Sequence, residues 1–134
     1  MSDPDQAVAQ YIDAVATSPL SDYTIGVNLF QGPMRPQSSV VPHRVLFVLS
    51  YGGGLPLDKF NGNSILRHRV QVMIRGNIDA FSTAQTDARA LFDELHLAPI
   101  SGYMRCAALD PVFLGVDDTE HPLFSLNLEL WREP

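Results

Sequence analysis

One continuous stretch, residues 45–77, constrains the fold more than any other part of the sequence. Val45–Leu49 is apolar throughout, Gly52–Gly54 follows it, and Ile65–Arg75 alternates between apolar and polar residues. Successive side chains of a strand point to opposite faces of a sheet, so the alternation predicts a strand with one apolar and one polar face. The predicted inner residues are Val70, Val72 and Ile74, and the outer ones are Arg69, Gln71, Met73 and Arg75. We therefore expect strand, glycine loop and strand, followed by a helix.

Two segments have the residue spacing of amphipathic helices. The first begins at Asp3, which is expected to form a capping box with Gln6, and ends near Ser18 because a proline follows. The second is expected from Asp79 to about His96. Its predicted apolar stripe consists of Ala80, Phe81, Ala84, Ala88, Leu91, Phe92 and Leu95. Its side chains expected to face water are Gln85, Asp87, Arg89, Asp93 and Glu94.

The remaining strands are predicted on both sides of the second helix. Thr24–Phe30 is expected to point Ile25, Val27 and Leu29 inward, and His43–Ser50 follows it. After the helix come Tyr103–Leu109, its continuation Pro111–Gly115 and a closing strand through Arg132. In the closing strand, the apolar residues Phe124, Leu126, Leu128 and Leu130 alternate with Ser125, Asn127, Glu129 and Trp131.

This order of elements predicts a single α+β domain over residues 1–134, with a mainly antiparallel or mixed sheet and two helices packed on one face. The polar sides of two strands indicate that the other face meets either water or a partner. A Pro-rich loop over residues 31–42 and a Gly-rich loop over residues 52–63 are expected to extend from the domain. In an assembly such loops would be docking arms.

Charge is distributed unevenly along the chain. The net charge is −6, which argues against a general nucleic-acid binder. Residues 1–34 carry −4, residues 35–75 carry +5, and residues 76–134 carry −7. A basic middle between acidic ends predicts self-complementary contacts between copies, although charges dispersed over a solvated surface explain the same counts.

Several simpler features limit the possible functions. Cys106 is the single cysteine, so an intrachain disulfide is impossible and a buried structural thiol is expected. We find no apolar run long enough to cross a bilayer and expect no membrane partner. Gly52–Gly54 lacks the Gly-Lys-Ser/Thr ending of a phosphate-binding loop, so a wide turn is the better interpretation.

The densest polar cluster is residues 117–121, with the sequence Asp-Asp-Thr-Glu-His. Three acids and a histidine can ligate a hard cation, but their consecutive order is not that of a calcium loop. A hairpin turn is therefore expected here. The rival hypothesis is a metal-dependent enzyme that uses Asp117, Asp118 and His121, with Glu120 beside them. A third reading is a small-molecule sensor with a cleft between sheet and helix.

Three groups of residues resemble the tail terminator, or tail completion, proteins of long-tailed bacteriophages and gene transfer agents, often described as minor capsid proteins. The first is Tyr51–Pro56 after an apolar strand. The second is Arg69–Gly76, followed by a helix with Ala84, Ala88 and His96. The third comprises Pro111–Asp118 and Phe124–Arg132, so the resemblance covers most of residues 24–134.

The resemblance implies a structural virion protein without cofactor or catalytic residues. Members of this family form a hexameric ring that caps the tail tube, stops its growth and joins the tail to the head-side connector, while DNA passes through without specific binding. Assembly takes place in the bacterial host cytoplasm, and a head–tail connector or adaptor of the same particle is the alternative. The expected interface residues are Arg67, Arg69, Arg75, Lys59, Arg35, Trp131, Arg132, Asp117 and Asp118.

Overall fold

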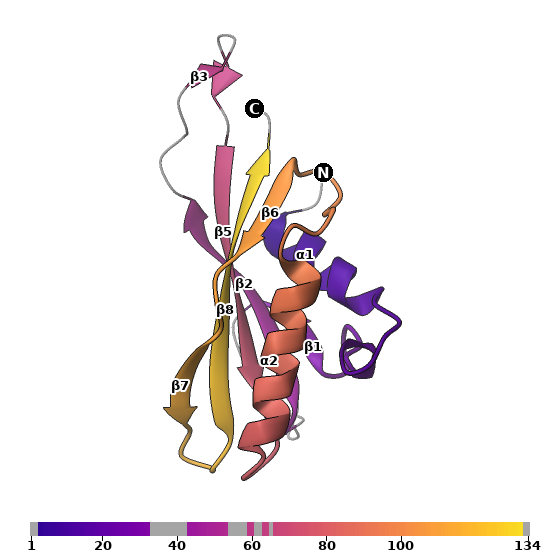
Figure 1. The fold of residues 1–134 in the computed structure, drawn as a ribbon, viewed down its shortest axis with the longest axis vertical. Coiled ribbons are helices and arrows are strands. Elements are labelled where there is room, and N and C mark those ends of the chain that lie inside the picture. The colour runs from indigo at the N-terminus through magenta and orange to yellow at the C-terminus, as the bar shows by residue number, and fades with distance from the viewer. Residues whose placement is uncertain (1–2, 33–42, 54–58, 61–62, 65, 133–134) are drawn as a thin grey trace.

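The computed structural model describes residues 3–32, 43–53, 59–60, 63–64 and 66–132. A six-stranded mixed sheet carries two helices on one face, which confirms the predicted α+β fold (Figure 1). The helices are α1 (Pro4–Asp13) and α2 (Phe81–Leu95), and a short 3-10 helix, η1 (Leu20–Asp22), follows α1. The sheet consists of β1 (Leu29–Gln31), β2 (Val45–Gly53), β5 (Leu66–Arg75), β6 (Arg105–Ala108), β7 (Val112–Val116) and β8 (Pro122–Arg132). A separate hairpin is formed by β3 (Lys59–Phe60) and β4 (Asn63–Ser64).

The centre of the sheet is the long antiparallel pair β5–β8. It runs without interruption from Leu66 opposite Arg132 to Arg75 opposite Leu123. β2 pairs antiparallel with the other side of β5, and β1 lies parallel to β2 at the outer edge. At the opposite edge, β6 pairs with the C-terminal half of β8 and β7 with its N-terminal half. Each edge of the sheet therefore has two distinct parts.

The alternation in β5 and β8 places one apolar face against the helices. The predicted inner side chains of both strands are buried and join one core with the apolar side of α2. Burial of this much apolar area is the main favourable contribution to folding. The core residues on these elements are Val70, Val72, Ile74, Ala84, Ala88, Leu91, Leu95, Phe124, Leu126, Leu128 and Leu130. The face opposite the helices, here called the helix-free face, carries the alternate residues.

Gly76 allows β5 to turn into α2 at close range. A Cβ atom built on Gly76 would lie 2.7 Å from the Cβ of Ala84 and 3.0 Å from Cγ of Pro122. The first distance is shorter than real carbon contacts and the second is at their lower limit, so glycine at this position allows the first turns of α2 and the start of β8 to approach each other.

Two predictions for the N-terminal region are wrong. α1 ends at Asp13 and not near Ser18, and the Asp3 side chain makes no capping hydrogen bond. The predicted strand Thr24–Phe30 is reduced to β1, and Ile25 and Val27 are 45% and 61% exposed.

A turn explains the shortened strand. The Asn28 side chain accepts a hydrogen bond from the Thr24 amide and donates one to the carbonyl of Asp22, and Gly26 has φ +87°. An asparagine that binds nearby backbone groups stabilises a turn at the expense of an extended strand.

The second helix and the later strands agree with the predictions apart from their bounds. α2 begins at Phe81 and not at Asp79, which has a positive φ of 57°. The predicted break between the penultimate strands is the boundary between β6 and β7.

Most of the two predicted loops, 31–42 and 52–63, lies outside the described residues. Neither described helix combines the length and apolar character of a membrane span.

Candidate assembly surfaces

Arginine and tryptophan side chains gather at one end of the helix-free face. Across β5, β8 and β6, the neighbouring positions are Arg67, Trp131 and Arg105. The Arg105 guanidinium lies over the Trp131 ring, 4.8 Å from its centroid. Cation–π contact of this kind stabilises an exposed arginine modestly and holds its charge at the surface. We call Arg67, Arg69, Arg105, Trp131 and the nearby Glu129 the basic end.

The positive charges of the basic end exceed its internal acid. The Arg67 Nη1 atom is 3.8 Å from Glu129 Oε2, and Arg69 is the cross-strand neighbour of the same glutamate. Trp131 Nε1 also donates to Glu129 Oε2 at 3.5 Å, near the limit of a hydrogen bond. Within the described part of the chain, the basic end therefore holds three arginines and one carboxylate, which leaves positive charge for a partner.

Two other predicted interface arginines, Arg75 and Arg132, do not join this cluster. Arg75 lies eight residues beyond Arg67 on β5, roughly 27 Å away at about 3.4 Å per residue. Its Nε atom donates to the carbonyl of His43 at 3.0 Å. Arg132 lies next to Trp131 in β8 and therefore on the opposite face of the sheet. Lys59 is part of β3, and Arg35 lies outside the described residues.

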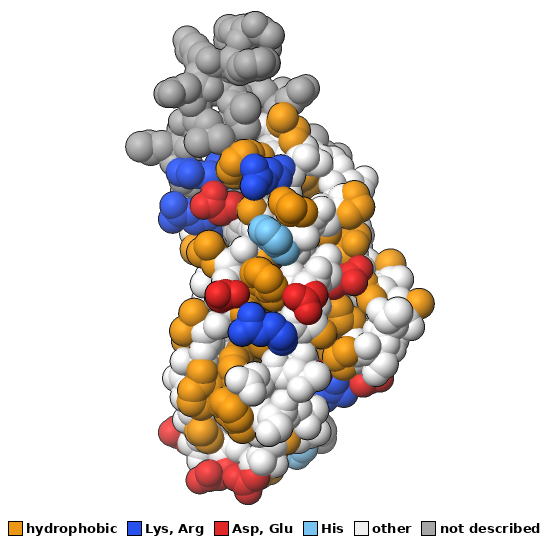
Figure 2. All heavy atoms as spheres, viewed as in Figure 1, with side chains coloured by type: hydrophobic (Ala, Val, Ile, Leu, Met, Phe, Trp, Pro, Cys, Tyr) orange, Lys and Arg blue, Asp and Glu red, His pale blue; other side chains and the backbone are white. Residues whose placement is uncertain are grey.

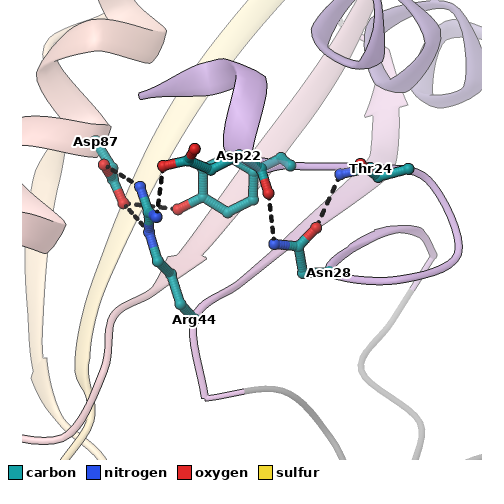
Figure 3. A network of polar contacts seen from close by, with 6 residues as sticks. Asp22, Thr24, Asn28, Arg44 and Asp87 are labelled. Carbon is teal, nitrogen blue, oxygen red and sulfur yellow. Dashed lines mark hydrogen bonds and ion pairs between the residues drawn. The ribbon is translucent and has the colours of Figure 1, made fainter. Parts of the chain in front are cut away.

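A different arginine, Arg44, forms an internal ion pair at the junction of β2 and α2 (Figure 3). Its Nε and Nη2 atoms donate to the two carboxylate oxygens of Asp87 at 2.8 and 2.9 Å. Nη1 donates to Asp22 at 2.9 Å, and the Tyr23 hydroxyl donates to Asp87 at 2.7 Å. Burial and the neighbouring Asp87 raise the pKa of Tyr23, and the hydrogen bonds to Asp87 raise that of Arg44.

This cluster corrects the prediction that Asp87 faces water. The Asp87 side chain is 1% exposed and is held by a bidentate guanidinium, the strong geometry for a carboxylate. One part of the predicted basic middle is therefore neutralised inside the chain and contributes little to any interface.

The acidic cluster forms the turn between β7 and β8, as predicted for a hairpin. Asp117 Oδ1 accepts hydrogen bonds from the amides of Thr119 and His121, both at 2.9 Å, and from the Thr119 hydroxyl at 3.0 Å. Burial alone would raise the pKa of Asp117, but hydrogen bonds from His121 and Thr119 lower it to about 2. Asp118 and Glu120 are exposed beside it.

Two of the predicted metal ligands of this turn, Asp117 and His121, contact each other and neighbouring side chains. His121 Nδ1 is 2.7 Å from the Thr119 hydroxyl and 3.1 Å from Asp117 Oδ1, and His121 Nε2 is 2.7 Å from Nδ1 of His43. Both ring nitrogens therefore contact side chains, and the Asp117 carboxylate closes the turn. In the described ranges, no group of three or more His, Cys, Asp or Glu side chains is arranged to hold a metal ion.

The region between sheet and α2, where a small-molecule sensor would have its cleft, is filled by core side chains. Leu91 and Leu95 of α2 and Leu126 of β8 are all 0% exposed. A hollow of about 370 Å³ lies on the water-facing side of α2 and is lined by Gln85, Thr86, Arg89, Ala90 and Asp93. It is not between helix and sheet.

Strand β7 is an apolar edge that the sequence analysis did not single out. Four of its apolar side chains are 46–55% exposed, those of Val112, Phe113, Leu114 and Val116. β7 pairs with β8. Hydrophobic side chains gather at the lower left of Figure 2, where Figure 1 places β7, with acidic side chains below them. Phe113 also packs edge-on against Phe81, with ring centroids 5.0 Å apart. Exposed apolar strand edges are usually blocked by charge or cover, because they pair with other chains.

No family model matches this sequence, and no curated protein matches it either. Among solved structures, a chain from the virion of a native gene transfer agent (GTA) particle is similar to this chain. The two have a TM-score of 0.68 and 17% sequence identity, and the match covers 98% of this chain and 95% of that chain. At this level of identity the similarity shows that the two chains share a fold over nearly their whole length.

Proposed function

We propose that this chain is a structural subunit of a phage-like virion and acts there as the tail terminator. The observation that carries the proposal is the fold shared with a gene transfer agent virion chain, which extends over 98% of this chain. The sequence resemblance to tail terminator proteins supports the more specific role. Its three groups of residues occur in the order found in that family, along β2, β5 and β8. Six copies would form a ring on the end of the tail tube.

The separation of the charged surfaces supports a closed ring. The ring needs a heterologous interface, in which two different patches of each subunit meet. The basic end and the acidic turn, residues 117–121, lie at opposite ends of β8. Copies arranged head to tail would bring the basic end of one towards the acids that flank β7 in the next, with the attraction greatest at low salt.

The same charges suit a channel for DNA. The net charge of −6 means that a ring of six carries a large excess of negative charge, which repels phosphates. Contacts with the tail tube on one side and a head-side connector on the other complete the proposed role. In this arrangement DNA passes without specific binding.

A charge reversal with a matched control tests the proposal. Arg67 and Arg69 would be changed together to Glu, and Arg89→Glu on the outer side of α2 would serve as the control. Arg89 is exposed and binds Asp110 at 3.3 Å on the helix side. Electron micrographs of each protein with isolated tail tubes should show terminal rings for wild type and Arg89→Glu, and at least a tenfold loss for the double variant.

The opposite results have distinct meanings. Rings of unchanged abundance in the Arg67→Glu, Arg69→Glu variant would contradict the basic end as an interface. Wild-type rings that bind the head-side connector but never the ends of tubes would favour the connector or adaptor role over the terminator role.

A further inference from the structure

The two edges of the sheet each contain one covered part and one open part. At the first edge, β1 pairs with β2 as far as Val48. The turn that precedes β1 covers β1 in turn, because the Gly26 amide donates to the Leu29 carbonyl at 3.0 Å. At the opposite edge, the Leu97 amide donates to the Cys106 carbonyl of β6 at 2.7 Å, and His96 Nδ1 accepts from the Ala108 amide at 3.1 Å. The open parts are Leu49–Gly53 of β2 and Val112–Val116 of β7. On the outer side of each, no other described strand forms a pair.

We propose that the open part of β7 in one copy pairs with the open part of β2 in the next copy, so that sheets join around the ring. The inference rests on the proposed ring and identifies its subunit joint. An edge strand binds an extended segment through backbone hydrogen bonds, while side chains on alternate positions provide selectivity. Both open segments contain five residues.

Strand direction supports this partner. β2 is antiparallel to β5, β5 to β8 and β8 to β7, so β7 runs antiparallel to β2. Two copies in the same orientation therefore place β7 of one beside β2 of the next as an antiparallel pair, with their helices on the same face. This is a head-to-tail contact that repeats, as a ring requires.

Charge supports the same partner and disfavours pairing between two β7 strands. β7 is preceded by Asp110 and followed by Asp117 and Asp118, so antiparallel pairing with another β7 would place acid opposite acid. In the pair with β2, Val112 instead lies level with Gly53 and Val116 with Leu49, so Asp110 comes towards the segment of β5 that holds Arg67 and Arg69, and Asp117 and Asp118 lie level with the apolar Val48 and Phe47. Like charges directly opposite destabilise a strand pair, whereas opposite charges stabilise it.

The two open parts are offset along the strands. β7 lies beside residues 122–125 of β8, whereas the open part of β2 is level with residues 68–71 of β5, opposite residues 127–130 of β8. The offset of about five residues is roughly 17 Å at about 3.4 Å per residue. A ring built from such a staggered join requires strands that tilt relative to its axis, as in closed barrels.

Directed cross-linking tests the joint. Tyr51→Cys and Leu114→Cys would be prepared as separate variants at the centres of the two segments, where the native side chains are 48% and 49% exposed. Each would be treated with oxidant or with a short bismaleimide that tolerates a slip of one or two residues. The protein would be tested alone at high concentration and on isolated tail tubes. Cys106 should not react, because it is fully buried and burial raises its pKa to about 11.

The joint predicts a covalent dimer from the mixture of the two variants, at least tenfold more abundant than from either variant alone. The double variant should give a ladder of oligomers. Failure of the mixed dimer both in solution and on tubes would overturn the joint, and so would an equally abundant dimer from Leu114→Cys alone.

Two results separate the joint from the proposed function. Rings of six subunits without the mixed dimer would overturn the joint and leave the terminator role standing. A cross-linked ladder that closes at another number, or continues as an open chain, would support the joint and contradict the terminator ring.

Discussion

Two arginines from the same basic segment of the sequence have opposite fates in the fold. Arg44 is held by two carboxylates and a tyrosine, with three contacts of 2.8–2.9 Å at the junction of sheet and α2. Arg67 lies on the helix-free face, and its carboxylate partner among the described residues, Glu129 Oε2, is 3.8 Å away. The charge of Arg44 is used within the chain, whereas that of Arg67 is available to a neighbour.

This difference extends to the regions around the two residues. The helix side is closed by a continuous apolar core and by a bidentate ion pair whose carboxylate, that of Asp87, is buried. The basic end and β7 combine one loose ion pair, the exposed Phe113 ring and an open strand edge. We infer that the helix side determines stability, while the helix-free side and the β7 edge are free to bind.

The largest effect on stability is expected from Asp87→Ala. Removing Asp87 takes away the bidentate partner of Arg44 and the acceptor of the buried Tyr23 hydroxyl, and leaves Arg44 with the exposed Asp22 alone. Breaking a buried pair in this way should lower the free energy of unfolding by about 3 to 5 kcal/mol. Urea unfolding measures the loss. Asp93→Ala is the matched control, because Asp93 is exposed on the same helix and should change stability by less than about 0.5 kcal/mol. Equal losses in the two variants would remove the distinction between the regions.

Gly76→Ala should have the next largest effect. The added methyl group would overlap with Ala84 and Pro122, and overpacking of this kind costs about 1 to 3 kcal/mol. The helix would have to move away from the start of β8. Thermal unfolding reports the cost, and a variant as stable as wild type would contradict the close approach at this turn.

Asp117→Asn should produce a smaller, pH-dependent effect. The folded-state pKa of Asp117 is lowered from 3.8 to about 2, so its contribution is present above about pH 4 and is lost as the pH falls towards 2. The variant should be less stable than wild type by about 1 to 2 kcal/mol at pH 7. The difference between the two unfolding free energies should close between pH 4 and 2. Asp118→Asn should show no such closure, and a difference that does not vary with pH would contradict the role given to Asp117.

The smallest effect on the isolated subunit is expected from Arg67→Ala. Its long contact with Glu129 is partly exposed, and exposed ion pairs contribute about 0 to 1 kcal/mol. A loss of 3 kcal/mol or more in urea unfolding would show that the basic end stabilises the fold itself. In that case assembly defects at this position could not be assigned to an interface.

The sequence was sufficient for the elements that obey one simple pattern. The period-two alternation of β5 and β8 predicted their buried and polar faces, and the apolar stripe of α2 predicted most of its buried residues. Pattern analysis failed at Asp87, because an aspartate on a helix is usually exposed and its partner Arg44 is distant in the sequence. It also failed at Thr24–Phe30, where the hydrogen bonds of Asn28 replace an extended strand with a turn.

The candidate surfaces were only partly predictable. The sequence predicted Arg67, Arg69 and Trp131 as interface residues, and this stays a prediction. Only the register of the sheet shows that Arg105 lies beside Trp131 and that Arg75 lies far away. β7 was predicted as an extended segment, but its apolar residues gave no sign of whether another strand would cover them. The pairing of β6 and β7 with different halves of β8 leaves β7 at the edge.

Hydrogen–deuterium exchange of the free subunit and of the protein assembled on tail tubes tests the division between the two regions most directly. The account predicts slower exchange on assembly in residues 49–53 and 112–116 and around Arg67 and Trp131, with little change in α2. Protection confined to α1 and α2, with unchanged exchange in β7 and at the basic end, would contradict it.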